Sequence, residues 1–293
     1  MLESKIHFIS GLPRSGSTLL SAILRQNPRF HAGMTSPVGP LFNACLNAMG
    51  ADNEFAVFFK EEQKRSILKG IFDNYYQYLE TSEVCFDTNR MWTSRMAPVR
   101  QLYPDSKMIC CVRNPAWVMD SVERLIRKNA FDVSRMFNNP QERSTIYTRA
   151  DALLHPNRMI GFAWSALKEA YYSADSDMML LVDYDLLASR PSEVLPLIYQ
   201  FIGEEAFDHD FDNVEYEAED FDSQLLVKDL HTVRGKVELK ERQTILPPDL
   251  FKRFQDLIFW QDGQGTRAHR IVVTQDPSTA DVLDEIEIPI DVE

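Results

Sequence analysis

The sequence of 293 residues has little that would mark a secreted or membrane-inserted protein. Its four cysteines, Cys45, Cys85, Cys110 and Cys111, show no CxxC or Cys/His ligand spacing, which argues against a disulfide framework and against a zinc site. It contains no run of about 18 apolar residues, the length that a membrane-spanning helix needs. The chain enters a predicted strand almost at once, which leaves no room for a signal peptide. The sequence therefore predicts a cytoplasmic protein.

Basic residues are fewer than acidic ones, and the difference lies mainly in two segments. The net charge is −13, with 31 Lys and Arg against 44 Asp and Glu. Residues 204–222 hold ten acids and residues 271–293 hold seven, and neither segment has a Lys or Arg. Without those 17 acids, 27 acids stand against all 31 basic residues. We therefore expect a mildly basic body with two acidic appendages, and neither nucleic acid nor an anionic membrane as a partner.

The most informative stretch is a glycine-spaced loop between the first predicted strand and the first predicted helix. Residues 11–18 read Gly-Leu-Pro-Arg-Ser-Gly-Ser-Thr, and the helix that follows is expected to end at Asn27-Pro28. A strand, such a loop and a helix N-terminus direct backbone N–H groups at a phosphate. The spacing is that of a P-loop, but Ser17 stands where the lysine is required, and the positive charge has moved to Arg14. The loop predicts an anion site and disfavours a nucleoside-triphosphate enzyme.

Apolar segments that alternate with helical patterns predict an α/β fold. Buried strands are expected at residues 5–10, 83–86, 107–112 and 178–182. Alternation of this kind is typical of βαβ units around a central parallel sheet with helices on both faces. The acidic segment and the residues after it, to about 246, are expected to form an extended loop. We expect one domain at residues 1–270 and an acidic tail at residues 271–293.

Two elements of the chain resemble the nucleotide site of a known family. Residues 13–20, Pro-Arg-Ser-Gly-Ser-Thr-Leu-Leu, look like the 5′-phosphosulfate loop of sulfotransferases that use 3′-phosphoadenosine-5′-phosphosulfate (PAPS), and the tyrosylprotein and Golgi-type branch is the most similar. Arg113 follows a predicted strand, at the sheet edge where ligands bind. Arg113 with Ser121 eight residues later resembles the arginine and serine that hold the 3′-phosphate in this family. A guanidinium fork and a hydroxyl suit phosphate oxygens.

The resemblance implies a sulfotransferase with a three-layer, P-loop-like α/β fold and PAPS as its co-substrate. It implies a late basic loop over the nucleotide, for which residues 231–236 are the candidate, and the alternative is a solvated turn paired with nearby acids. The residues implied to bind PAPS are Arg14, Ser15, Gly16, Ser17, Thr18, Arg113, Ser121 and Arg234. Arg14 is also expected to act in catalysis by facing the phosphosulfate. Sulfuryl transfer relies on fixed donors and cations, and the sequence contains no metal-ligand constellation.

The general base is the point at which this chain departs from the family. Thr35 occupies the position of the catalytic glutamate of tyrosylprotein sulfotransferases, and threonine cannot act as a base near neutral pH. Asp87, after the second predicted strand, and His31 are the alternatives, and a readily ionised acceptor would need little help. Arg90 is expected to stabilise the leaving oxygen, with a salt bridge to Asp87 as the alternative.

The acceptor is expected to be a small molecule or a peptide that offers a hydroxyl or an amine. Its pocket is expected from residues 33–46 and the helices before Phe86, which are rich in aromatic residues; the alternative for those aromatics is burial in the core. Two other functions stay open at this point. One is a P-loop kinase that needs Mg²⁺ and ATP. The other is a non-catalytic protein that binds PAPS or its product, adenosine 3′,5′-bisphosphate (PAP), and the missing glutamate favours it.

Overall fold

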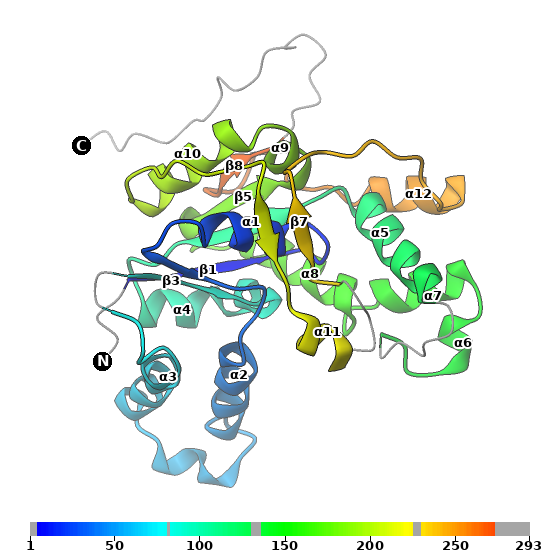
Figure 1. The fold of residues 1–293 in the computed structure, drawn as a ribbon. Helices are drawn as coiled ribbons and strands as arrows, with labels where there is room; N and C mark the ends of the chain where they lie inside the picture. Colours follow the sequence, from blue (N-terminus) through cyan, green and yellow to red (C-terminus); the bar gives the residue numbers. More distant parts are fainter. Residues whose placement is uncertain (1–4, 81–82, 130–135, 225–229, 273–293) are drawn as a thin grey trace.

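A six-stranded parallel sheet forms the centre of the computed structural model, which describes residues 5–80, 83–129, 136–224 and 230–272 (Figure 1). In spatial order the strands are β2 (Phe30–Ala32), β3 (Val84–Thr88), β1 (Lys5–Gly11), β4 (Met108–Val112), β5 (Met179–Asp183) and β8 (His269–Ile271). All neighbouring pairs run parallel, so the carboxyl ends of the strands meet at one edge of the sheet. The predicted α/β fold with a central parallel sheet is confirmed.

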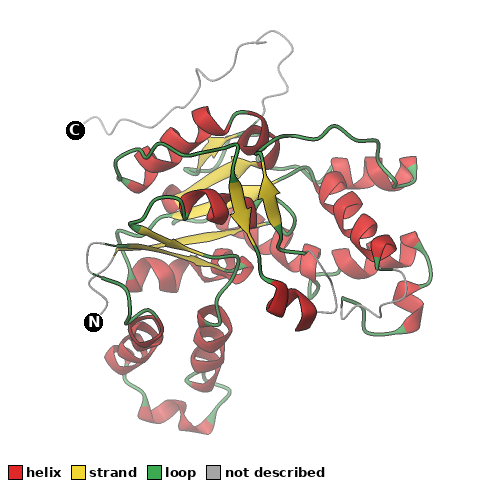
Figure 2. Ribbon diagram, viewed as in Figure 1, coloured by secondary structure: helices red, strands yellow, loops and turns green. Residues whose placement is uncertain are grey.

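Helices connect the strands and cover both faces of the sheet, as Figure 2 shows. The α-helices are α1 (Ser17–Leu24), α2 (Val38–Ala48), α3 (Glu61–Tyr75), α4 (Met96–Leu102), α5 (Pro115–Lys128), α6 (Pro140–Arg143), α7 (Ile146–Leu154), α8 (Met159–Tyr171), α9 (Tyr184–Ser189), α10 (Pro191–Ile202), α11 (Glu219–Gln224) and α12 (Pro248–Gln255). Three short 3-10 helices are η1 (Glu54–Phe58), η2 (Arg90–Arg95) and η3 (Ser176–Met178). α1 begins directly after Gly16, and α5 and α12 each have a proline in the first turn.

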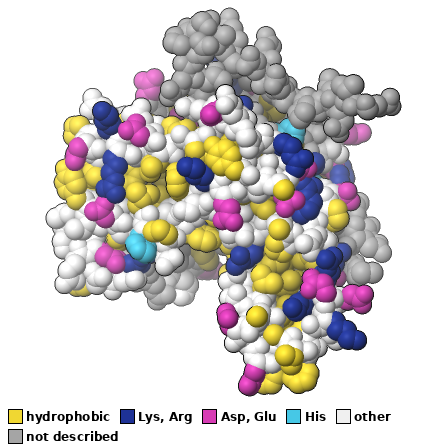
Figure 3. Space-filling model, turned by 180° about the vertical axis from the view of Figure 1, so that it is seen from behind, with side chains coloured by type: hydrophobic (Ala, Val, Ile, Leu, Met, Phe, Trp, Pro, Cys, Tyr) yellow, Lys and Arg dark blue, Asp and Glu magenta, His cyan; other side chains and the backbone are white. Residues whose placement is uncertain are grey.

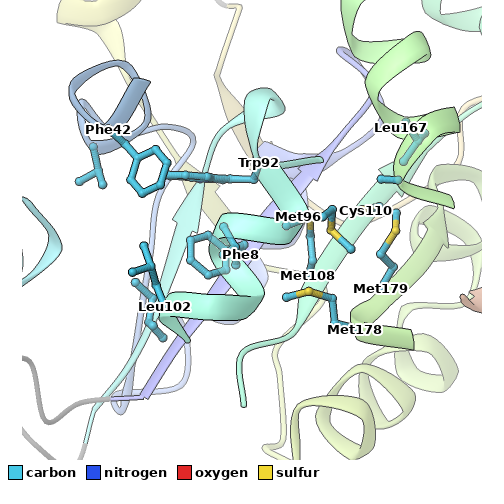
Figure 4. Close-up of a cluster of buried hydrophobic side chains, with 14 of the residues drawn as sticks. Phe8, Phe42, Trp92, Met96, Leu102, Met108, Cys110, Leu167, Met178 and Met179 are labelled. Atoms are coloured by element: carbon cyan, nitrogen blue, oxygen red, sulfur yellow. The ribbon is translucent and has the colours of Figure 1, made fainter. Parts of the chain in front are cut away.

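Successive residues of β1 point to opposite faces and so build two cores. Phe8 points to the face that α4 and α8 cover. The centre of its ring lies 5.0 Å from that of Trp92, which belongs to η2. Figure 4 shows this core, with Trp92 between Phe8 and Phe42 and several sulfur-containing side chains beyond them. Ile9 faces the other way, toward apolar residues of α1 and α10. Each face of the sheet is therefore closed by helices, as the near-continuous apolar strands predict.

The sequence analysis missed two strands of the sheet and a second, smaller sheet. β2 and β8 have three residues each, too short for a periodic pattern to reveal them. β6 (Val214–Tyr216) and β7 (Val233–Gly235) pair antiparallel beside α1, and α11 lies between them in the chain (Figure 1). The predicted extended loop is therefore wrong here, because buried Val214 packs into the α1 core and anchors the segment.

Helices α2 and α3 project from the body as a lobe (residues 38–75; Figure 1). Their inner sides join the core through Phe42 and Phe72, which are fully buried. Figure 3 shows apolar side chains on the outer surface of this lobe, and Phe55, Val57 and Phe58 of η1 are exposed there. The aromatics that were expected at an acceptor pocket are thus divided between the core and the tip of the lobe.

The end of the described chain lies at the sheet edge. β8 reaches Ile271, which is buried, so the sheet includes the first residue of the predicted tail. Residues 273–293, the rest of that tail, lie outside the described residues, and the domain boundary stays a prediction. Within the part of the chain that the structure describes, no helix has both the length and the apolar composition to cross a membrane.

Candidate functional site

A cavity of about 680 Å³ lies at the carboxyl edge of the sheet. The strand ends contribute Ser10 and Thr88 to its wall, and Arg113 and Tyr184 follow directly after β4 and β5. The loop between β1 and α1 forms one side, and the segment from β7 to Arg242 forms another. Parallel α/β sheets bind ligands at this edge, so this cavity is the candidate active site.

The loop after β1 is held in a conformation that leaves backbone amides free for an anion. Gly16 has φ +92° and directly precedes α1, and it has no side chain to cap the helix. The first turn of α1 contains no acidic residue, so its unpaired N–H groups and positive dipole end remain available. Gly16, Ser17 and Thr18 line the cavity, whereas Ser15 is buried and its hydroxyl donates to the Pro13 carbonyl at 3.3 Å.

Arg14 connects this loop with α5. Its Nε donates to Ser121 Oγ at 3.2 Å, and its Nη1 donates to the carbonyl of Leu230. Burial lowers the pKa of the Arg14 guanidinium, and the positive charges of Arg113 and Arg242 lower it further. Because its ordinary pKa is so high, Arg14 stays charged at neutral pH. The loop and the Arg113–Ser121 element, far apart in sequence, therefore meet at one place, as the resemblance implied.

Arg113 lies against Tyr184 and makes a long ion pair with Asp185. The guanidinium carbon is 4.1 Å from the centre of the Tyr184 ring, and Nε is 3.5 Å from Asp185 Oδ1. That nitrogen has no hydrogen-bond partner among the described residues, although Arg113 is 9% exposed. A buried guanidinium with an unpaired N–H, placed beside a second arginine in a cavity wall, suits an anionic ligand. Asp185 balances the charge of Arg113 only in part, because Asp185 is itself 35% exposed.

Residues within 231–236 line the cavity, as a basic loop over the nucleotide would, and they also pair with nearby acids, as a solvated turn would. Arg234 lies on β7 and lines the cavity, and it also pairs with Glu217 at 2.5 Å. Lys236 likewise lines the cavity and pairs with Asp212. Arg242, which the sequence analysis did not identify, also lines the cavity, and its charge reaches both Arg14 and Arg113. The role of Arg234 toward PAPS stays a prediction, and Arg242 is likewise paired, with Asp120 Oδ2 at 3.1 Å.

Thr35 and Arg90 both line the cavity. The position of the family glutamate therefore faces the site, although threonine occupies it. Arg90 begins η2, directly beyond β3, where Ser10 Oγ donates to its backbone carbonyl at 3.2 Å. The structure records no ion pair between Arg90 and Asp87 among the described residues, because other donors take that carboxylate.

Asp87 does not fit the role of general base. It is fully buried and lies outside the lining of the cavity. Its carboxylate accepts hydrogen bonds from three buried donors, the hydroxyls of Ser36 (2.5 Å) and Tyr76 (2.7 Å) and the indole N–H of Trp92 (2.7 Å). Burial raises the pKa of Asp87 despite these bonds. Because the donors come from the start of α2, the end of α3 and η2, Asp87 ties the lobe to the sheet.

Replacement of Asp87 by alanine is therefore expected to lower stability rather than nucleotide binding. Three buried donors would lose their acceptor, and each unpaired group costs about 1–3 kcal/mol, so we expect a loss of at least ~3 kcal/mol in unfolding free energy. Asp87→Asn retains an acceptor and should lose less. Urea unfolding with and without PAP measures both effects. A stable Asp87→Asn variant that binds PAP normally but has lost all sulfuryl transfer would instead support a catalytic role.

Two histidines stand in segments that the sequence analysis considered for the site. His31 lies outside the cavity lining, and His231 lies within it. His31 is half-buried, and its Nε2 lies 3.1 Å from the Tyr78 hydroxyl. His231 was noted only as part of the basic loop, yet its Nδ1 is 2.6 Å from Asp222 Oδ1 in the cavity wall. The sequence offered no signal for this pair, because its members stand in an acidic and a basic segment that were interpreted separately. Among the described residues, no group of three or more His, Cys, Asp and Glu side chains is arranged to hold a metal ion.

Comparison with known proteins identifies the fold and the family. A retinol dehydratase in complex with androsterone and inactive cofactor PAP has the same fold, with a TM-score of 0.50 and 14% identity over 88% of this chain and 80% of that one. The sulfotransferase domain from the curacin biosynthetic pathway gives a TM-score of 0.49 and 14% identity over 87% of this chain and 92% of that one. No curated protein sequence matches the chain. The family profile described as "Sulfotransferase family" matches residues 7–209. Because that match spans more than half of the 293 residues, this protein belongs to the sulfotransferase family.

Proposed function

We propose that this sulfotransferase takes its sulfuryl group from PAPS and transfers it to a hydroxyl or an amine of a small-molecule or peptide acceptor. One observation carries the proposal: the loop after β1 and Arg113 line one cavity, and Arg14 of that loop donates from Nε to Ser121 Oγ at 3.2 Å, although Ser121 itself lies outside the lining. A nucleotide with phosphates at both its 5′ and 3′ positions needs two such binding elements. PAP, the bisphosphate named with the retinol dehydratase structure, is that kind of molecule.

The residues present fit such a donor. The first-turn amides of α1 and the hydroxyls of Ser17 and Thr18 would hold the 5′-phosphosulfate, because helix N-termini favour anions. The guanidinium of Arg113, whose ion pair with Asp185 is long at 3.5 Å, and the hydroxyl of Ser121 would hold the 3′-phosphate. Gly16 allows the ring of Tyr184 to pack against this loop, since a Cβ there would lie 2.8 Å from Tyr184 Cδ2.

The cavity is also suited to the charge that sulfuryl transfer develops. PAPS supplies an activated sulfuryl group, and negative charge grows on the oxygen that leaves with the 5′-phosphate. Arg14 and Arg90 are fixed cations in the same wall, and such preorganised charges are usually the largest contribution to catalysis of this type. We assign the phosphosulfate to Arg14, the leaving oxygen to Arg90, and outer contacts to the 3′-phosphate to Arg242 and Arg234.

Transfer from labelled donors tests this function directly. The enzyme is incubated with a cell extract and either [³⁵S]PAPS or [γ-³²P]ATP with Mg²⁺, and the products are separated and counted. We expect ³⁵S-labelled products that depend on the enzyme, and no enzyme-dependent ³²P label. Label from ATP alone would identify a kinase. Binding of PAP without any ³⁵S transfer would identify a non-catalytic nucleotide-binding protein.

A further inference from the structure

A histidine and a buried carboxylate form a pair in the wall of the cavity. His231 Nδ1 lies 2.6 Å from Asp222 Oδ1, and the backbone N–H of His231 donates to Asp222 Oδ2 at 2.9 Å. Asp222 is 2% exposed and lies on α11, and His231 lies two residues before the start of β7. The Phe221 ring lies edge-on to the imidazole, with 5.7 Å between centroids. One hydrogen bond from Nδ1 and one aromatic contact thus fix the imidazole, and the backbone N–H of the same residue binds the second oxygen of the carboxylate.

This pairing sets the tautomer of the imidazole. A carboxylate accepts hydrogen bonds, so the proton of the neutral His231 ring is on Nδ1, and Nδ1–H donates a hydrogen bond to Asp222. The neutral ring then carries its lone pair on Nε2, for which no described residue provides a hydrogen bond. His231 itself lines the cavity. A histidine oriented in this way by a buried acid has the arrangement of a general base in many enzymes.

The surroundings of His231 favour the neutral form of the ring, which is the form that a general base needs. Burial lowers the pKa of His231, and the positive charges of Arg14 and Arg90 lower it further, while Asp222 raises it. The ring is therefore neutral near pH 7. Both arginines line the same cavity as His231, and their charges act on its imidazole.

We infer that His231 is the general base that deprotonates the acceptor, with Asp222 as its positioning residue. The inference rests on the proposed function and supplies the group that is missing at Thr35. The acceptor O–H or N–H gives its proton to His231 Nε2 while the acceptor atom forms a bond to sulfur. The bond between sulfur and the 5′-phosphate oxygen breaks, and its electron pair leaves with PAP. Asp222 stabilises the imidazolium, which then releases its proton to water.

The test compares three histidine variants in the ³⁵S transfer assay. His231→Gln should lower incorporation by about 100-fold or more, because general base catalysis contributes that much. His31→Gln removes the alternative base, and His155→Gln is the matched control: His155 is exposed and lies outside the cavity lining. Both should stay near the wild-type rate. The thermal shift caused by PAP should be the same in all four proteins, and imidazole should restore part of the transfer to His231→Ala.

Asp222→Asn provides a readout that a purely structural role would not give. The negative charge of Asp222 raises the pKa of His231, so its loss should move the acidic limb of the pH–rate profile to lower pH, together with a lower maximal rate. Transfer by His231→Gln at more than about a third of the wild-type rate would overturn the inference while leaving the proposed function intact. Loss of transfer in His31→Gln instead would move the base to that residue. Absence of transfer in the wild-type protein would refute both proposals.

Discussion

Replacement of Arg113 by alanine is expected to abolish most of the preference of this protein for PAP over AMP. The two nucleotides differ in the 3′-phosphate, and Arg113 is the buried cation assigned to it. A charge-assisted hydrogen bond contributes about 1.5–3 kcal/mol, and a paired contact to phosphate lies at the upper end of that range. We therefore expect PAP binding to weaken by roughly 100-fold and AMP binding to change only a few-fold. Calorimetric titration of both nucleotides measures this directly.

Two further variants control for general damage. Arg113→Lys keeps the charge but loses the fork and the contact with Tyr184, so an intermediate loss is expected. Arg253→Ala removes an arginine that pairs with Asp151 outside the cavity lining, and it should bind both nucleotides as the wild type does. Equal weakening of PAP and AMP by Arg113→Ala would show that the residue supports the cavity without contacting the 3′-phosphate.

The largest effect on stability is expected from Gly11→Ala. Gly11 ends β1 with φ +109°, and a Cβ there would lie 2.1 Å from the carbonyl oxygen of Cys111 in the neighbouring strand β4. Backbone atoms of a central strand cannot move aside, so the overlap adds to the strain of the positive φ. We expect a loss of more than ~3 kcal/mol in unfolding free energy, from about 1–3 kcal/mol of backbone strain plus a comparable cost for overpacking. Urea unfolding, or failure to obtain soluble protein, would register it.

Gly235 offers a matched control for that variant. It too has a positive φ, +83°, but no described atom lies within 4 Å of its expected Cβ. Gly235→Ala therefore isolates the backbone strain, and we expect a loss of about 1 kcal/mol. If both variants were equally destabilised, close contact between β1 and β4 would not be the reason for glycine at position 11.

Local sequence patterns predicted the centre of the fold well and its margins poorly. Four strands carry continuous apolar runs because both of their faces are buried, and all four are present. β2 and β8 are three-residue edge strands that exist because their neighbours offer hydrogen bonds, and a local pattern cannot show this. The β6–β7 pair likewise depends on the apolar surface that α1 provides for Val214.

The sequence predicted those site residues that belong to one local motif. It did not predict contacts between segments that are far apart in the chain. Arg113 and Ser121 are eight residues apart on a strand end and the helix that follows, a local geometry that puts them beside Arg14. Asp87 also follows a strand, but the three donors that bury its carboxylate come from distant parts of the chain. Asp222 and His231 become a pair only through the fold of α11 against the β7 segment. For that reason residue type and position alone could not identify the pair that we propose as the base and its positioning residue.

A crystal structure of the protein with PAP bound tests the central claim most directly. The account predicts the 5′-phosphate at the first turn of α1, against Gly16, Ser17 and Thr18, and the 3′-phosphate within hydrogen-bonding distance of Arg113 and Ser121. A nucleotide bound elsewhere, or bound with its 3′-phosphate in solvent and Arg113 still on Asp185, would contradict it.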